Sequence, residues 1–443
     1  MKQSDKLFDA ATEIAAKLQQ AGYQAFFAGG FVRDMLLEID QKNDIDIATD
    51  ATPAHIAGLF SRVLRVGEHF GVMIVIYKGY MFEVATFRSD IGIKDGRRPE
   101  KVVFTSAQED AQRRDFTING LFYDPVKCKI LDFVNGREDL RAGNIRAIGD
   151  PARRFDEDYL RLLRAIRFSA RFGFSIEAHT WTCLCTSRNG ITRISAERIY
   201  QELTRMLLGP LPSRAFSLLR ESGLLALILP EVHALGGVEQ PGRFHPEGDV
   251  WEHTLHALDN LQSPTLIAAW AVLLHDIGKP PTISQTDRIR FNNHASVGAH
   301  MSETVLKRLK APGEVIKKVA ACIRHHMNFM HVQKMKVSTL KRYLARPTIE
   351  DELKVHYADC MSSHRKLDNY YYLKKQQAQL SREQIQPSPL ISGNDLIVLG
   401  LKPGPHFRKI LDAAYDRQLE GILATTEEAL AWVRQYLHAK PTG

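Results

Sequence analysis

Hydrophobic and polar residues follow two different periods along this chain. Up to about residue 140, short apolar runs at 25–28, 72–77 and 81–86 alternate with helix-like segments, the first of which ends at Gln20. From Asp156 onward, apolar residues recur at the 3.6-residue spacing of amphipathic helices, and β-branched runs become rare. The pattern predicts a mixed α/β head followed by an all-helical remainder.

The composition is typical of a globular protein with several domains. The chain has 443 residues, 44% hydrophobic and 25% charged, which is too long for one core. Its net charge of +8 favours a polyanionic partner, because lysine and arginine release counterions from phosphates. The polar N-terminus and the short apolar run at 266–274 indicate neither export nor membrane insertion. Five scattered cysteines suggest a reducing compartment, so we expect a cytoplasmic protein.

A turn with two glycines follows the strand predicted at 25–28. Gly29 and Gly30 allow the backbone to approach a phosphate closely, and Arg33 adds a cation for the same anion. A plain glycine turn is the simpler alternative, and this signal alone does not decide between the two.

Two aspartates alternate with isoleucines in the segment 43–48. Asp44 and Asp46 would therefore project from one face of a strand. Paired carboxylates favour one or two Mg²⁺ ions bound together with substrate phosphates, which is the arrangement used for phosphoryl transfer. Glu83 could supply a third carboxylate, although a solvated strand residue explains it equally well.

Four motifs then occur in a fixed order. They are Gly29-Gly30-x-x-Arg33-Asp34, Asp44-x-Asp46, Arg113-Arg-Asp-Phe-Thr-Ile-Asn119 and Glu157-Asp-x-x-Arg-x-x-Arg164, and a helical segment at 197–203 follows them. In this order they resemble the class II CCA-adding enzymes and bacterial poly(A) polymerases. The resemblance implies a polymerase-β-like nucleotidyltransferase that adds C and A nucleotides from CTP and ATP to the 3′ end of tRNA.

The resemblance also implies the roles of individual residues. Asp44 and Asp46 would be catalytic and hold Mg²⁺. The residues that would bind the nucleotide are Gly30, Arg33, Arg114, Asp115, Asn119, Asp158, Arg161, Arg164 and Arg167.

The segment 157–167 reads as one helix with Asp158, Arg161 and Arg164 along one face. Asp158 can accept a hydrogen bond from the exocyclic amine of C or A, and Arg161 can donate to the neighbouring ring acceptor, whereas U lacks the amine. The protein itself would then select the base. An ordinary ion pair on an exposed helix is the simpler alternative.

The segment 87–100 resembles the family's flexible loop. It keeps the ending Asp95-Gly-Arg-Arg-Pro99 but has Gly92 and Ile93 where many relatives carry an aromatic residue. This departure leaves CC-only or A-only addition open, and poly(A) synthesis shares all of the quoted motifs.

A second constellation lies in the helical remainder. Its members, in the order His, His-Asp, Asp, are His253, His275, Asp276 and Asp359. This order resembles the HD phosphohydrolases and implies a divalent transition metal, and His294 and His325 could hold a second ion. A metal-dependent phosphohydrolase acting on phosphoesters is therefore the alternative from another class.

Clusters of turn-forming residues near 209–212 and 386–389 mark boundaries in the helical part. Together with the two resemblances they predict a nucleotidyltransferase head at 1–143, a helical neck at 144–212, an HD body at 213–385 and a helical tail at 386–443.

Overall fold

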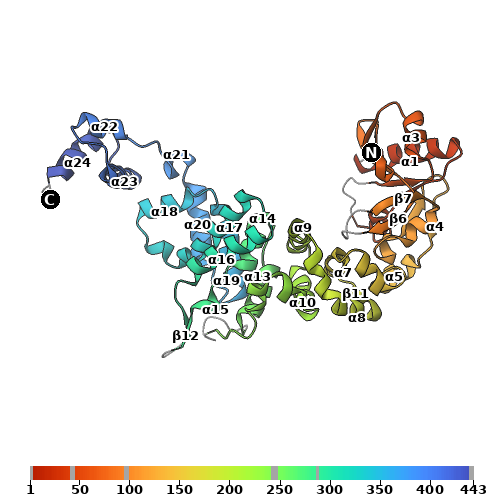
Figure 1. Cartoon of the computed structure of the whole chain (residues 1–443). Coiled ribbons are helices and arrows are strands. Elements are labelled where there is room, and N and C mark those ends of the chain that lie inside the picture. The colour runs from red at the N-terminus through yellow and green to blue at the C-terminus, as the bar shows by residue number, and fades with distance from the viewer. Residues whose placement is uncertain (1–2, 40–44, 94–98, 241–247, 286–288, 439–443) are drawn as a thin grey trace. The chain divides into compact units, whose positions relative to one another are not determined.

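A computed structural model describes residues 3–39, 45–93, 99–240, 248–285 and 289–438 (Figure 1). The chain divides into two compact units, Met1–Pro230 and Glu231–Gly443. The finer division into head, neck, body and tail stays a prediction.

The first unit begins with a seven-stranded mixed sheet in the order β3-β4-β5-β2-β1-β8-β9. Its strands are β1 (Ala25–Ala28), β2 (Ile47–Thr49), β3 (Val63–Gly67), β4 (Val72–Tyr77), β5 (Tyr80–Thr86), β8 (Leu121–Asp124) and β9 (Lys129–Asp132). The pair β2–β5 is parallel, with Ile47 opposite Val84, and the other pairs are antiparallel.

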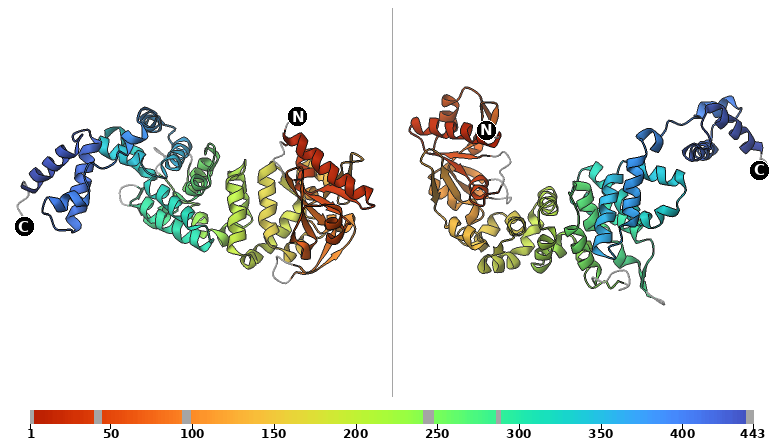
Figure 2. Two further views of the ribbon diagram at one scale, coloured as in Figure 1. Left: turned by 90° about the horizontal axis from the view of Figure 1, so that it is seen from above. Right: turned by 180° about the vertical axis from the view of Figure 1, so that it is seen from behind.

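Both faces of this sheet are covered, because successive residues of β1 point in opposite directions. Phe27 packs edge-on against Phe8 of helix α1 (Gln3–Gln20), which lies along one face of the sheet (Figure 2). Phe26 belongs to the opposite core with Phe87 and Phe122. The other head helices are α2 (Gly30–Leu36), α3 (Pro53–Leu59), α4 (Ala107–Gln112) and α5 (Gly136–Ala142).

Helices make up most of the rest of the first unit. They are α6 (Pro151–Glu157), α7 (Leu160–Phe172), α8 (Ala178–Ser187), α9 (Ala196–Leu207), α10 (Pro212–Glu221) and α11 (Leu224–Ile228). The short helix α12 (Pro230–His233) contains the boundary between the two units. Helix α7 packs against both α9 and α10. Its apolar side is buried, including Leu162, Leu163 and Ile166, and its arginines lie on the other side.

The second unit is also built of helices. They are α13 (Val250–Asp259), α14 (Leu266–Leu274), α15 (Lys279–Thr282), α16 (His294–Arg308), α17 (Gly313–His325), α18 (Val337–Leu344), α19 (Ile349–Ser362), α20 (Asp368–Gln379), α21 (Arg382–Ile385), α22 (Gly393–Val398), α23 (Pro405–Leu419) and α24 (Thr426–His438). The apolar run at 266–274 is a buried core helix around Trp270. In the described part of the chain, no helix is long and apolar enough to cross a membrane.

The predicted fold class is confirmed, with small differences in detail. The first helix ends at Gln20 and the strand at 25–28 is present. The helical remainder also contains two short strand pairs, β10 (Asn144–Ile145) with β11 (Ser175–Ile176), and β12 (Ile283–Gln285) with β13 (Ile289–Phe291). The segment expected to be a flexible loop contains the antiparallel strands β6 (Arg88–Ile93) and β7 (Pro99–Phe104), and residues 94–98 lie outside the described ranges.

The start of α5 provides a test of the packing beneath the 113–119 motif. A Cβ atom at Gly136 would lie 2.2 Å from the carbonyl oxygen of Thr117, so Gly136→Ala must displace the backbone. We expect it to lower the free energy of unfolding by about 1–3 kcal/mol, measured by urea denaturation. Gly58→Ala is the control, because no atom lies within 4 Å of its new Cβ and alanine favours the helix α3. An equal loss of stability in both variants would contradict the assigned close contact.

Candidate nucleotide and metal sites

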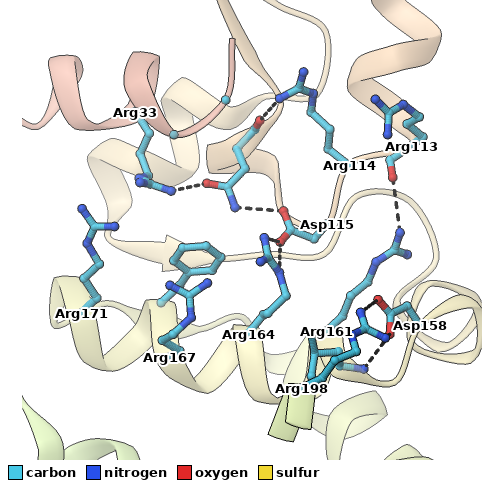
Figure 3. Close-up of a pocket in the computed structure, with 15 residues that line it drawn as sticks. Arg33, Arg113, Arg114, Asp115, Asp158, Arg161, Arg164, Arg167, Arg171 and Arg198 are labelled. Carbon is cyan, nitrogen blue, oxygen red and sulfur yellow. Dashed lines mark hydrogen bonds and ion pairs between the residues drawn. The ribbon is translucent and has the colours of Figure 1, made fainter. Parts of the chain in front are cut away.

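A polar cavity of about 490 Å³ lies between α2, the 113–119 motif and α7 in the first unit (Figure 3). It is lined by Gly29, Gly30, Arg33, Arg113, Arg114, Asp115, Asn119, Asp158, Leu160, Arg161, Arg164, Arg167, Phe168, Arg171 and Arg198. The structure therefore gathers in one cavity every residue that the sequence assigned to the nucleotide. Eight of the lining residues are arginines, so the cavity suits a polyanion.

The glycine turn at the head of α2 packs closely against this cavity. Gly29 has φ 65°, and a Cβ atom there would lie 2.7 Å from Nη1 of Arg114. Only glycine combines this backbone conformation with so close an approach of a guanidinium. Arg33, in the first turn of α2, is buried and donates to Asp34 and to Oδ1 of Asn119.

Asp115 is the buried centre of a hydrogen-bond network in the 113–119 motif. Its carboxylate accepts from Nε of Arg164 at 2.7 Å, from Nδ2 of Asn119 at 2.9 Å and from the backbone N–H of Phe116 at 2.8 Å. Burial alone would raise the pKa of Asp115, but the Arg164 charge and these donors lower it to about 2. The network links Arg33 through Asn119 and Asp115 to Arg164 (Figure 3).

The helix predicted at 157–167 is wrong in one respect, because the chain breaks at Asp158. Helix α6 ends at Glu157 and α7 begins at Leu160, while Asp158 has the extended conformation φ −154°, ψ 102°. Oδ1 of Asp158 accepts from the N–H of Leu160 at 3.0 Å, which satisfies a donor at the start of α7. A Cβ atom on Gly190 would lie 1.9 Å from the Tyr159 ring, so the break is packed against a position that only glycine fits.

The break changes the ion pairs of this segment. Arg161 pairs with Glu157 at 2.9 Å and not with Asp158. Asp158 pairs with Arg198 of α9, with Oδ2 accepting from Nη2 at 2.7 Å. Arg198 was missed as a site residue, although it lies in the 197–203 segment that the sequence had marked.

Two carboxylates meet in a smaller cavity of about 190 Å³ at the sheet. Asp46 lies just before β2 and Glu83 lies on β5, and the parallel pairing of Ile47 with Val84 brings them together. The expectation that Asp46 lies within a strand is therefore wrong by one residue, since β2 begins at Ile47. Asp44 lies outside the described residues. Arg113 and Arg114 line both cavities, so the acidic pair adjoins the arginine-rich cavity.

The chemistry of this acidic pair fits a hard divalent cation. Asp46 and Glu83 are both exposed and offer carboxylate oxygens, the donors that Mg²⁺ prefers. Glu83, which the sequence left open between a third ligand and a solvated strand residue, lines the same cavity as Asp46.

Six side chains of the second unit form two groups of possible metal ligands. The first group is His253, His275 and Asp359, and the second is Asp276, His294 and His326. Within each group the ligand atoms lie within 4.8 Å of one another. All four residues that the sequence assigned to the HD site are thus brought together.

The histidine rings in these groups present lone pairs to one another. Nδ1 of His275, His294 and His326 each lies within 2.8 Å of a backbone carbonyl oxygen, which can only accept. The proton must therefore be on Nδ1 in each ring, and in His294 and His326 Nε2 carries the lone pair, whereas Nε2 of His275 lies 3.2 Å from the carboxylate Oδ2 of Asp276. Nε2 of His294 lies 3.2 Å from Nε2 of His326, a repulsive approach that a bound cation would relieve.

The predicted second ligand pair is wrong by one residue. His326, which is 3% exposed, lies in the second group, whereas His325 contacts Asn328. Helix α17 ends at His325, and consecutive helical residues point about 100° apart, so only one of the doublet can face inward.

The protonation states of the cluster also suit metal ligands. Burial, helped by the neighbouring His275 and His294, lowers the pKa of His326 to about 3, so its ring is neutral at pH 7. Burial alone would raise the pKa of Asp359, but the hydrogen bond from His253 and the positive charge that His253 carries when protonated hold that pKa well below the usual range, and a bound cation would take the place of that proton.

Comparisons with known proteins identify the families that match the chain. The models "Poly A polymerase head domain", "Probable RNA and SrmB- binding site of polymerase A" and "HD domain" match residues 25–146, 173–235 and 250–363. The CCA-adding enzyme of Bacillus licheniformis is 35% identical over 314 residues, which cover 71% of this chain and 70% of that enzyme. The CCA-adding enzyme of Geobacillus sp. strain WCH70 is 43% identical over 50% of this chain, and the match spans little more than half of that enzyme, 55%.

A solved structure extends the similarity to nearly the full length. The Bacillus stearothermophilus CCA-adding enzyme in complex with CTP has a TM-score of 0.77 and 28% sequence identity. The alignment covers 99% of this chain and 99% of that one.

The depressed pKa of Asp115 predicts how its network stabilises the fold. A carboxylate with a native pKa near 2 and an unfolded value near 3.9 contributes about 2–3 kcal/mol above pH 5. This contribution falls to about half at pH 3 and is lost near pH 2, because protonation removes the charge. Asp115→Asn should therefore cost about 2 kcal/mol at pH 7 in urea denaturation, and the difference from wild type should shrink as the pH falls.

The control is Asp412→Asn, which removes an exposed carboxylate of α23 and should change stability by less than about 0.5 kcal/mol. A cost for Asp115→Asn that stays constant between pH 7 and pH 3 would contradict the assigned charge.

Proposed function

This chain belongs to the CCA-adding enzymes, and from that premise we propose that it adds C and A nucleotides to the 3′ end of tRNA, without a nucleic-acid template, from CTP and ATP. The observation that carries the proposal is the arginine-rich cavity that adjoins the carboxylates Asp46 and Glu83. tRNA and nucleoside triphosphates are cytoplasmic, so we place the enzyme there.

The cavity supplies the groups that such a transfer needs. Arg33, Arg114 and Arg164 would bind the triphosphate, and Gly30 would let it approach the backbone. Asn119 and Asp115 would hold the sugar side of the nucleotide in place through the buried network. The nucleotide would thus be fixed before the attacking hydroxyl arrives, which lowers the entropic part of the barrier.

Nucleotidyltransferase and HD domains both imply divalent metal ions, and we propose that Mg²⁺ is the ion of the head. Asp46 and Asp44 would hold it as the catalytic carboxylates, and Glu83 would complete the donor set. When bound, Mg²⁺ neutralises charge on the triphosphate and favours ionisation of the attacking 3′-hydroxyl.

The base would be selected by the part of the cavity formed by Asp158 and helix α7. Asp158 would accept from the exocyclic amine shared by C and A, and Arg161 would donate to the neighbouring ring acceptor. Arg164 and Arg167 would support the base and the phosphates, since their guanidinium groups stack on Phe168 at 5.3 and 4.2 Å from the ring centroid.

The test uses tRNA transcripts that lack all or part of the CCA end, with CTP, ATP or both, and sequencing of the products. Asp46→Asn should lower incorporation by about 10³-fold or more, because the variant lacks a charged metal ligand, while tRNA binding survives. Asp50→Asn, at an exposed aspartate just after β2, should retain incorporation.

The products separate the related activities. Completion of the CCA end by the wild-type protein would support the proposal. Products with only C, only A or a poly(A) tract would instead indicate a partial-repair enzyme or a poly(A) polymerase. Incorporation retained by Asp46→Asn would contradict the metal role of that carboxylate.

We propose a second activity, metal-dependent phosphoester hydrolysis, at the cluster of the second unit. The convergent Nε2 atoms favour it, as do the carboxylates of Asp276 and Asp359, whose pKa values lie well below the usual range. We propose that His253, His275, Asp276 and Asp359, together with His294 and His326, hold divalent transition-metal ions. Such ions would supply an activated water for attack on phosphorus.

The adjacent histidines His325 and His326 form a matched pair for testing this site. His326→Ala should weaken Mn²⁺ binding by about 10- to 100-fold in calorimetry and reduce hydrolysis of a chromogenic phosphodiester in parallel, because a ligand is lost. His325→Ala should bind Mn²⁺ like wild type. Equal loss in both variants, or wild-type binding by His326→Ala, would contradict the ligand assignment.

A further inference from the structure

The two residues proposed to select the base do not bond to each other. Asp158 and Arg161 are three residues apart, the spacing of an ion pair within one helix. The break between α6 and α7 separates them, and each has a different charged partner. Asp158 pairs with Arg198 (Figure 3). Arg161 pairs with Glu157.

Arg198 holds the Asp158 carboxylate with two hydrogen bonds. Nη1 donates to Oδ1 at 3.2 Å and Nη2 donates to Oδ2 at 2.7 Å. A planar guanidinium bound in this way fixes the plane of the carboxylate as well as its position. Both side chains line the cavity and are about one-fifth exposed, at 20% for Asp158 and 19% for Arg198.

The described bonds leave Asp158 able to read a base. Oδ1 accepts from Arg198 and from the N–H of Leu160, which together use its two lone pairs. Oδ2 accepts from Arg198 and keeps a further lone pair, which suits the exocyclic amine of C or A.

Helix α9 is well placed to hold this side of the cavity rigid. Its residues Ile199, Leu203 and Met206 are buried, and the helix packs along α7. Glu202, one turn after Arg198 and only 2% exposed, accepts from Nε of Arg167 at 2.6 Å. One helix therefore fixes both Asp158 and an arginine of α7.

Loss of Arg198 would free Asp158 in two ways. The backbone of Asp158 lies outside both helices. Without the Arg198 guanidinium, the Asp158 side chain can therefore change rotamer. The freed carboxylate could then pair with Arg161, and such a pair would occupy both of the groups that read the base.

We infer that Arg198 is a specificity-determining positioning residue, which orients Asp158 toward the incoming base and keeps it from pairing with Arg161. This inference rests on the proposed nucleotide addition. Arg198 acts through Asp158 and not through its own contact with the nucleotide.

The test measures kcat and KM for CTP, ATP and UTP on tRNA that lacks its CCA end, for wild type and variants. Arg198→Gln should lower the selectivity for CTP over UTP about tenfold, the effect of one misplaced hydrogen bond. Arg198→Lys keeps the charge but not the planar guanidinium, so its selectivity should lie between that of wild type and that of Arg198→Gln. Arg205→Gln removes an arginine from the same helix that is 58% exposed, and it should keep wild-type selectivity.

A double-mutant cycle distinguishes positioning from a general structural role. In an Asp158→Ala background, which should itself lose discrimination against UTP and GTP, Arg198→Gln should have no further effect on selectivity. An additional loss in that background would mean that Arg198 contacts the nucleotide directly, and would overturn the inference.

The remaining outcomes are also decisive. Unchanged selectivity in both Arg198→Gln and Arg198→Lys, with wild-type thermal unfolding, would overturn the inference while leaving the proposed function intact. If Arg198→Gln does not fold, the selectivity of Arg198→Lys alone decides. Absence of incorporation by the wild-type protein would instead refute the proposed function.

Discussion

The structure of the first unit depends on the electrostatic problem of placing eight arginines around one cavity. Like charges at these separations repel strongly wherever water is partly excluded. Each of these arginines pairs with a carboxylate of the protein. The acidic partners are Asp34, Asp110, Asp115, Glu157, Asp158 and Glu202.

These pairs are worth more as positioning devices than as sources of stability. Forming a partly buried ion pair gains little beyond the cost of desolvating its two charges, whereas removing one partner, as in Asp115→Asn, is costly because the other charge is left unpaired. Asp34 joins Arg33 to Arg171, and Asp110 joins Arg113 to Arg114, so adjacent guanidinium groups are held at fixed places before any ligand binds. A triphosphate that enters this cavity meets donors that are already ordered, so its binding requires little rearrangement of the arginine side chains.

The sequence predicted several strands of the head and most of the described residues that line the nucleotide cavity and the histidine cluster, because these depend on local signals. Strand alternation located the strand at 25–28, and the spacing of glycines, acids and arginines identified the residues that line the cavity. Errors of one residue occurred where a local sequence pattern does not determine which way a side chain points. The His325–His326 doublet offers two equivalent ligands until the end of α17 decides which of them is buried.

The partner of Asp158 shows what a local pattern cannot supply. Three-residue spacing favoured Arg161, and nothing in 157–160 is a strong helix breaker, although Asp158 is a residue type that often caps a helix start. The break is stabilised by distant residues, with Gly190 accommodating the Tyr159 ring and Arg198 reaching Asp158 across forty positions. Tertiary contacts therefore override the helical propensity at this point, and the carboxylate faces the cavity because the chain is not helical there. A continuous helix would have placed Asp158 and Arg161 one turn apart on a shared face, where each would neutralise the other and neither would be available to a base.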